Sequence, residues 1–328
     1  MKRLNAEKLV TIIIPSKIVD TNLRFCIKKI LKYYKNIKII LLLDRDSKIK
    51  FSKNIEIIVT GNKAIGYKRN LGVKLSKTKY ISFIDSDAYP NNRWLDFILL
   101  SFKKNKNTIA VGGPNISPST SNIEKKLVSK VRKLFFVTFD NKVKYKTKFE
   151  FSTKYLPSVN LVIKKDIYLK LGGMNENINT GEDTVFMNNI NNKNYRMIQN
   201  GMAYVFHKDR NFRNFFRQRL VYGSNLVKNF FLSPSLITLM MCMSILPSVY
   251  FLMFPIVLFM DYFYLKIYFY GFLFLLLICI YFSFRIYEKG SFFKSFMLIL
   301  MSIFGPGLGF ILSLIRSEKS LRKIYTQV

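Results

Sequence analysis

The stretch Tyr80-Ile-Ser-Phe-Ile-Asp-Ser-Asp-Ala-Tyr-Pro90 sets the organisation of this chain of 328 residues. Tyr80–Ile84 is apolar apart from one serine and predicts a buried strand. The strand ends abruptly at Asp85 and Asp87, two carboxylates one residue apart. Such close acids repel each other, so solvent, a helix N-terminus or a metal ion has to offset the repulsion. The residues that surround this pair in the fold decide which of the three applies.

The segments around this stretch predict an α/β fold. Three earlier β-branched runs are typical of buried strands, namely Val10–Pro15, Ile37–Leu43 and Ile55–Val59. Three other stretches place apolar residues at helical spacing, namely Asn22–Tyr34, Ala64–Lys74 and Trp94–Phe102. Strands that alternate with helices of this length predict a mostly parallel sheet that is covered by helices on both faces.

In such a sheet, ligands bind beyond the carboxyl ends of the strands. The predicted strands are followed there by acids, hydroxyls and other small polar residues: Pro15-Ser16, Asp44 to Ser47, Thr60 to Asn62, and Asp85 to Asp87. Because the carboxyl ends of parallel strands meet at one edge, we expect these side chains to form one site.

The composition is strongly basic, with 53 Lys and Arg residues against 19 Asp and Glu residues and a net charge of +34. This balance favours phosphate-bearing partners such as nucleotides or anionic lipid surfaces. The lysines are scattered, however, and a coding bias toward Lys, Asn and Ile explains part of the excess, so we expect no nucleic-acid partner. Three widely spaced cysteines indicate neither a disulfide framework nor a metal motif and fit a reducing compartment.

The chain divides near Lys228, which predicts a first domain over residues 1–228 and a membrane region over residues 229–328. Three long apolar segments follow this point, each comparable to the ~20 residues that a spanning helix needs: Leu236–Met260, Ile267–Phe284 and Phe296–Ile315.

The number of full spans affects the charge balance across the membrane. Three spans would place the basic tail Arg316–Lys323 opposite the basic first domain, against the positive-inside tendency. A third segment that re-enters at Gly305-Pro306 would restore agreement, so we expect two spans plus a re-entrant hairpin. The expected location is a multi-pass position in the cell (inner) membrane, with the first domain facing the cytoplasm.

Two features later in the chain supply further candidate chemistry. Glu182 and Asp183 open an amphipathic helix, although acids in a first helical turn often only complement the helix dipole. His207, the only histidine, follows the strand-like run Met202–Phe206. Two carboxylates and one imidazole suit Mn²⁺ or Mg²⁺ that is shared with substrate phosphates.

Phe215–Gly223 combines arginines with aromatic residues just before the membrane region. This pattern is typical of an amphipathic helix at a membrane surface. It also suits a clamp for phosphate groups, because arginine forms strong bidentate hydrogen bonds with them. Both interpretations remain open.

In their order and spacing, these motifs resemble glycosyltransferase family 2 with the GT-A fold, in a membrane-anchored bacterial or archaeal form of the polysaccharide-building type. The resemblance covers about residues 9–225. It rests on eight features: Ile12–Pro15, Asp44, Gly66–Gly72, Asp85–Asp87, Gly172–Glu176, Gly181–Thr184, His207 and Gln218–Tyr222.

The resemblance implies a nucleotide-diphosphate sugar as donor and Mn²⁺ or Mg²⁺ as cofactor. Asp87, Asp85 and His207 would hold the metal, Asp183 would be the general base, and Glu182 would support it. The donor, including its base, ribose and diphosphate, would be contacted by Pro15, Ser16, Asp44, Arg69, Asn70, Asp85, Gln218, Arg219 and Tyr222.

The implied reaction is a metal-dependent, inverting transfer of a hexose to a hydroxyl of a lipid-linked or cell-surface glycan, with a polyprenyl-linked acceptor and membrane lipids as partners. Gln218-Arg-Leu-Val-Tyr222 lacks the second arginine and the tryptophan of the family's motif, which favours a single addition over processive extension. Asp44-Arg-Asp-Ser47 is also less acidic than usual. The alternatives are a polyprenyl-phosphate sugar synthase and a non-catalytic basic protein bound to the membrane.

Overall fold

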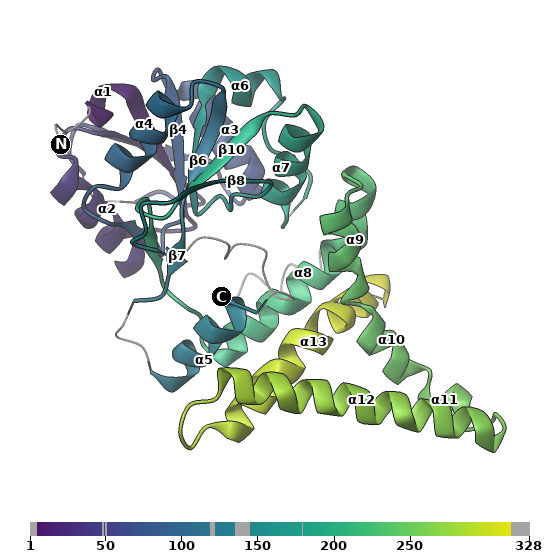
Figure 1. Ribbon diagram of the computed structural model, residues 1–328. Coiled ribbons are helices and arrows are strands. Elements are labelled where there is room, and N and C mark those ends of the chain that lie inside the picture. The colour runs from purple at the N-terminus through teal and green to yellow at the C-terminus, as the bar shows by residue number, and fades with distance from the viewer. Residues whose placement is uncertain are drawn as a thin grey trace. The chain divides into compact units, whose positions relative to one another are not determined.

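The computed structural model describes residues 5–47, 49, 51–118, 122–134, 145–178 and 180–315 (Figure 1). The chain forms two compact units. Unit 1 comprises Met1–Pro118 and Phe139–Lys208, and unit 2 comprises Ser119–Thr138 and Asp209–Val328. The basic tail Arg316–Lys323 lies outside the described residues.

Unit 1 contains an eight-stranded sheet in the order β3-β2-β1-β4-β9-β6-β10-β8. Only β9 and β8 run antiparallel to their neighbours, so the other six strands share one direction and the sheet is mostly parallel, as predicted. The strands are β1 (Val10–Pro15), β2 (Lys38–Leu43), β3 (Ile55–Val59), β4 (Tyr80–Ile84), β6 (Thr108–Gly112), β8 (Glu150–Thr153), β9 (Asn160–Lys164) and β10 (Arg196–Asn200).

Helices cover both faces of this sheet, because successive strand residues point to opposite faces. Ile12 and Ile14 pack with one set of helices, whereas Ile13 packs with the other. The first set is α1 (Ala6–Leu9), α2 (Thr21–Tyr33) and α4 (Trp94–Lys104). The second set is α3 (Ile65–Leu75), α6 (Lys165–Lys170) and α7 (Glu182–Asn192). The three helices predicted before residue 105 are therefore confirmed.

A small second sheet extends from this core in the order β5-β11-β7, with β5 at Ala88–Pro90, β7 at Asn115–Ile116 and β11 at Val205–His207. The buried side chain of Asn160 holds the segments before β7 and β11 against the core of the main sheet. Its amide donates to the carbonyls of Gly113 at 2.9 Å and Ala203 at 2.8 Å, and its oxygen accepts from Trp94 Nε1 at 2.8 Å. The core therefore fixes where β11 runs.

Unit 2 is helical in its described part. Its helices are α5 (Ile123–Arg132), α8 (Phe212–Leu232), α9 (Leu236–Met243), α10 (Leu246–Leu252), α11 (Phe254–Val257), α12 (Tyr262–Ile286) and α13 (Phe292–Ile315). Leu127, Val128 and Val131 of α5 pack with apolar residues of α8, α12 and α13. α8 and α13 approach each other very closely, because a Cβ built on Gly223 would lie 1.9 Å from the carbonyl oxygen of Pro306.

Two described helices, α12 and α13, are long and apolar enough to cross a membrane. The first predicted span, Leu236–Met260, in which Pro247 and Pro255 predict kinks, is divided into three short helices. Pro247 and Pro255 lie in the first turns of α10 and α11, where a residue without an N–H group is tolerated.

The predicted re-entrant bend at Gly305-Pro306 is wrong, because α13 runs as one helix through Pro306. The glycines there serve close packing rather than a turn. A Cβ on Gly305 would lie 2.6 Å from Cβ of Arg219, and one on Gly307 would lie 2.2 Å from Oγ of Ser248. Direct contact with α8 and α10 therefore occupies this stretch of α13.

Candidate active site

The carboxylates after β4 meet the single histidine at the edge between the two sheets. β11 pairs antiparallel with β5, and this register sets His207 opposite Ala88. His207 Nε2 consequently lies 3.1 Å from Asp87 Oδ1. One potential ligand atom from each of Asp85, Asp87 and His207 lies within 4.8 Å of the others. The three residues expected to hold a metal are therefore close together, and their oxygen and nitrogen atoms fit Mn²⁺ or Mg²⁺.

Arg69 connects this cluster to the start of α7. Its guanidinium donates to Asp85 Oδ1 at 3.1 Å and to Glu182 Oε1 at 2.5 Å, and the residue is only 1% exposed. The contacts use two separate nitrogen atoms, as the planar fork of arginine allows. A single buried cation thus joins the end of β4 to the first residue of α7.

Desolvation changes the acidity of both partners of Arg69. Burial raises the pKa of Glu182, and the ion pair with Arg69 opposes that rise. Desolvation in this crowded site also raises the pKa of Asp85; Arg69 opposes the shift and the Asp87 carboxylate adds to it. The site therefore concentrates negative charge that Arg69 only partly compensates.

Asp183, the expected general base, lies beside Glu182 in the first turn of α7. Its Oδ2 accepts hydrogen bonds from the backbone N–H of Ser158 at 3.3 Å and from the Ser158 hydroxyl at 3.2 Å. Gly181 precedes the helix with φ 82°, a left-handed conformation that favours glycine. The carboxylate is therefore held from the segment before β9, a contact that the sequence did not predict.

A second polar group lies at the ends of β1 and β2. Lys68 Nζ donates to the carbonyl oxygen of Ser16 at 2.9 Å and forms an ion pair with Asp44. Pro15 ends β1, and the hydroxyl of Ser16 donates to the carbonyl of Ile18 at 2.9 Å. Lys68 was missed in the sequence, although it precedes Arg69 in the quoted motif.

Asn70, expected near the donor, is 6% exposed and makes contacts within the protein. Its amide donates to the carbonyl of Met174 and to the carboxylate of Glu176, both at 2.8 Å, and its oxygen accepts from Tyr168 at 2.6 Å. Asn70 therefore holds the loop before α7 against α3.

Gln218, Arg219 and Tyr222 belong to α8 in unit 2. Gln218 Nε2 lies 3.0 Å from the Tyr222 hydroxyl, one helical turn away. The Arg219 guanidinium carbon lies 4.6 Å from the centre of the Tyr222 ring and 5.2 Å from that of Phe215. These three residues form one group on the helix surface, as their spacing predicts.

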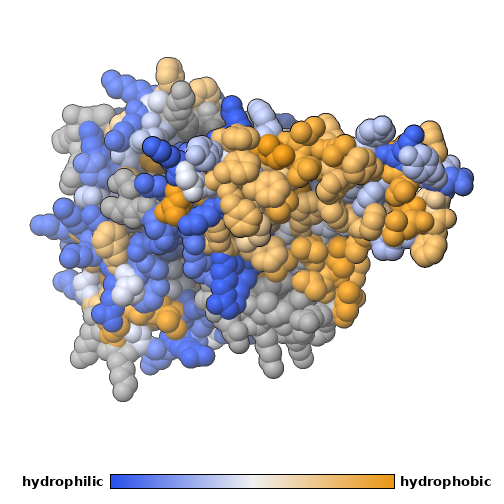
Figure 2. Space-filling view, turned by 90° about the horizontal axis from the view of Figure 1, so that it is seen from below, coloured by the Kyte–Doolittle hydropathy of each residue, from blue (hydrophilic) through white to orange (hydrophobic). Residues whose placement is uncertain are grey.

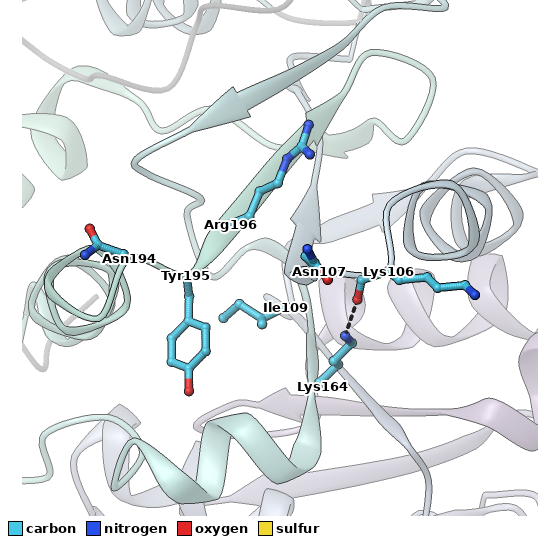
Figure 3. A pocket seen from close by; sticks show the side chains of 7 residues that line it. All are labelled: Lys106, Asn107, Ile109, Lys164, Asn194, Tyr195 and Arg196. Atoms are coloured by element: carbon cyan, nitrogen blue, oxygen red, sulfur yellow. Dashed lines mark hydrogen bonds between the residues drawn. The ribbon is translucent and has the colours of Figure 1, made fainter.

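A cleft of about 580 Å³ lies at the opposite edge of the main sheet, where β6 and β10 begin (Figure 3). It is lined by Lys106, Asn107, Ile109, Lys164, Asn194, Tyr195 and Arg196. Lys164 Nζ donates to the carbonyl of Lys106 at 2.9 Å, and Figure 3 shows the side chains of Lys106 and Arg196 extending in different directions. These cations do not converge on one point, so the carboxylate edge remains the candidate active site.

Comparison with solved structures finds a fold similar to that of a mannosyltransferase. The mannosyltransferase PcManGT from Pyrobaculum calidifontis, in complex with GDP-Man and Mn²⁺, superposes with a TM-score of 0.59 at 11% identity, covering 94% of this chain and 88% of that chain. GalNAc-T7 with UDP, GalNAc and Mn²⁺ gives a TM-score of 0.47 at 11% identity, covering 67% of this chain and 51% of that chain. No curated protein matches the sequence significantly.

The sequence itself matches a family model over a segment that includes Asp85 and Asp87. The model of "Glycosyl transferase family 2" aligns with residues 11–156, which include β1 to β4 and the Asp85–Asp87 pair. The mostly parallel sheet with its small second sheet agrees with the GT-A fold that the sequence motifs implied. Residues 11–156 therefore match glycosyltransferase family 2, and the protein carries a glycosyltransferase domain of this type.

Proposed function

We propose that this glycosyltransferase moves a sugar from a nucleotide-diphosphate sugar to a hydroxyl of a lipid-linked or cell-surface glycan, with inversion at the anomeric carbon. The observation that carries the proposal is the cluster of Asp85, Asp87 and His207 at the carboxyl end of β4. A divalent cation bound there would neutralise charge on the donor's diphosphate. The fold neighbour from Pyrobaculum calidifontis, which binds GDP-Man and Mn²⁺, supports this ligand class.

Asp183 is the proposed general base. The acceptor hydroxyl attacks the anomeric carbon, the bond from that carbon to the diphosphate oxygen breaks, and the hydroxyl proton passes to the Asp183 carboxylate. A single displacement of this kind inverts the configuration. The two hydrogen bonds from Ser158 orient one carboxylate oxygen and leave Asp183 partly exposed, so an acceptor can reach it.

Arg69 is proposed as a positioning residue between the two reacting centres. Its ion pairs with Asp85 and Glu182 fix the distance between the metal-binding strand end and the helix that carries Asp183. Because Arg69 is almost fully buried, this role differs from the direct contact with the nucleotide that the family resemblance implied.

The nucleotide is proposed to bind near Ser16, Lys68 and Asp44, which lie at the ends of β1 and β2. Gln218, Arg219 and Tyr222 are proposed to contact the diphosphate or the acceptor through α8. A polyprenyl-linked acceptor and membrane lipids are the proposed partners, because unit 2 carries two helices of spanning length. The corresponding location is the inner membrane, with unit 1 on the cytoplasmic side.

The proposal is tested by incubating the purified protein with individual nucleotide sugars, Mn²⁺ and a membrane lipid extract. We expect one donor to release its nucleoside diphosphate in step with a glycosylated lipid product. Parallel assays with polyprenyl phosphate and with lipid-linked oligosaccharide separate the synthase from the glycan-extending enzyme. Sugar transfer that continues undiminished in EDTA would contradict the proposed metal dependence.

A further inference from the structure

Exposed apolar side chains occur in both units, but they differ in kind. In unit 2 they are numerous from α9 to α13, and Figure 2 shows apolar side chains gathered over a broad area of the surface. The proposed membrane association accounts for such a surface. In unit 1 a group of aromatic side chains lies on and beside the small sheet β5-β11-β7, next to the candidate active site. None of these rings has a role in the reaction proposed above.

Five aromatic rings follow one another across this sheet. Phe206 and Tyr89 are directly paired residues of β11 and β5, and their ring centres lie 5.0 Å apart. On one side, the ring centre of Phe25 of α2 lies 5.0 Å from that of Tyr89. On the other side, the ring centre of Tyr204 lies 5.6 Å from that of Phe206, and that of Tyr145 lies 5.9 Å from that of Tyr204. These five residues, each at least partly exposed, form what we call the aromatic row.

The strand pairing connects the aromatic row to the candidate metal ligands. Successive residues of a strand point to opposite faces, so Phe206 points outward whereas the next residue, His207, lies against Asp87. Tyr89 of β5 is two residues after Asp87. The aromatic row therefore lies on the outer face of the same two strands that position the metal cluster, and a ligand that binds along it can extend to the candidate active site.

Two lysine side chains lie over rings at one end of the aromatic row. Lys29 Nζ lies 5.2 Å from the centre of the Phe25 ring and 5.8 Å from that of the Tyr89 ring. Lys208 Nζ lies 5.8 Å from the centre of the Phe25 ring. A cation held over an aromatic ring keeps its charge. Neither lysine forms an ion pair with a carboxylate of the described residues, so this end of the row favours an anionic group.

We propose that the aromatic row binds the acceptor, as a glycan of several sugars with acidic groups where it passes Lys29 and Lys208. One face of a sugar ring presents C–H groups, which pack against aromatic rings, while the tyrosine hydroxyls can form hydrogen bonds with the sugar hydroxyls. A six-membered sugar ring is similar in size to an aromatic ring, so the row accommodates several sugar units. The acceptor of the proposed transferase, on which this inference rests, is then a glycan rather than polyprenyl phosphate.

A lipid surface also suits aromatic rings that are flanked by lysines, but two observations favour a glycan. Tyr89, Tyr204 and Phe206 are only partly exposed, so they form a shallow surface rather than side chains that project into acyl chains. The row also continues to His207 and so to the candidate active site, a connection that a lipid contact does not need.

Binding of oligosaccharides in the absence of a donor tests the proposal, and it remains measurable even if no nucleotide sugar is turned over. Hexagalacturonate, which is acidic, and maltohexaose, which is neutral, are titrated calorimetrically into the purified full-length protein in detergent. We expect hexagalacturonate to bind more tightly, and Tyr89→Ala combined with Phe206→Ala to weaken its binding about tenfold through the lost ring contacts. Phe149→Ala removes a 67% exposed ring outside the row and should bind as the wild type does.

Lys29→Gln combined with Lys208→Gln keeps all five rings, so this variant does not depend on the folding of the first one. It should reduce the preference for hexagalacturonate over maltohexaose. Melting temperatures and Mn²⁺-dependent nucleotide binding, measured for each variant, separate a lost glycan site from a lost fold and from a failure of the proposed function.

No saturable binding of hexagalacturonate by the wild type, or equal affinity in the wild type and both double variants, would overturn the proposal. A lipid contact is tested with a fluorophore on Phe25→Cys, after replacement of the three native cysteines by alanine, in nanodiscs that contain nitroxide-labelled lipid. We expect little quenching. Strong quenching would assign the aromatic row to the membrane surface instead.

Discussion

Each unit contains a buried arginine, and the two differ in whether carboxylates compensate the charge. In unit 1, Arg69 is enclosed by the sheet and by α7, and two carboxylates compensate its charge. In unit 2, Arg219 is also buried, yet aromatic rings and a glutamine surround it and no described carboxylate pairs with it. A compensated charge fixes the geometry of a site, whereas an uncompensated one limits where its helix can lie. The first property explains the fixed geometry of the candidate active site.

Among changes at the candidate active site, loss of the proposed base is expected to give the largest effect. Asp183→Asn keeps the shape of the side chain but cannot accept the acceptor's proton, so the transfer rate should fall by about 10²–10⁴-fold. Nucleotide binding should persist. The rate is measured as product formed from the donor identified in the screen.

Asp166→Asn is the matched control, because Asp166 also lies in a first helical turn but is exposed on α6. It should transfer sugar at the wild-type rate. An Asp183→Asn enzyme as fast as the wild type would show that another group accepts the proton.

Removal of the buried cation in unit 1 is expected to destabilise the fold next most strongly. Arg69→Met leaves Asp85 and Glu182 without their partner, and breaking a buried ion pair from one side costs about 3–5 kcal/mol. Thermal unfolding measures the loss. Arg69→Lys should recover part of the stability, but a single ammonium cannot contact both acids with the geometry of a guanidinium.

Kinetics separate positioning by Arg69 from a purely structural role. In Arg69→Lys, kcat should fall more than KM changes, because the proposed base and the proposed metal-binding end of β4 lose their fixed separation. Arg196→Met removes an exposed arginine from the other edge of the sheet and should leave stability and kcat unchanged. Equal losses of stability and kcat in Arg69→Met and Arg196→Met would contradict the assigned role of Arg69.

A smaller effect is expected where unit 2 depends on close helix packing. Gly223→Ala introduces a Cβ that would lie 1.9 Å from the Pro306 carbonyl oxygen, and overpacking of this kind costs about 1–3 kcal/mol. The melting temperature of the purified protein in detergent should fall. Ser224→Ala, at the next residue, is the control. An unchanged melting temperature for Gly223→Ala would show that α8 and α13 do not approach each other at this point.

The sequence predicted the sheet core well because its strands are short, continuous apolar runs. Val10–Pro15, Ile55–Val59 and Tyr80–Ile84 have the predicted bounds. β8 and β9 could not be predicted in the same way, since their antiparallel positions depend on pairing between residues far apart in the chain. The ion pair of Arg69 with Glu182 could not be predicted either, because it joins residues 113 positions apart in the chain.

The candidate site was predicted as a set of residues but not as a set of contacts. Asp85 and Asp87 were predicted because they follow the apolar run of β4. His207 was predicted because it follows the strand-like run Met202–Phe206. No sequence motif indicates the contacts of Ser158 and Lys68, because tertiary packing alone brings these residues to Asp183 and Asp44. In unit 2, apolar length predicted α12, and the expected effect of Pro247 and Pro255 agrees with the interruptions within residues 236–260. The bend predicted at Pro306 is wrong, because α13 is continuous there.

Asp85, Asp87 and His207 are proposed to hold the metal that receives the donor's diphosphate. This assignment is tested most directly by calorimetric titration of the purified protein with UDP and with GDP, each in Mn²⁺ and in EDTA. The wild type and Asp183→Asn should bind one of these nucleotides in Mn²⁺, with binding lost in EDTA, and Asp87→Ala should lose it in both conditions. Undiminished Mn²⁺-dependent binding by Asp87→Ala would contradict the assignment of this cluster as the metal site.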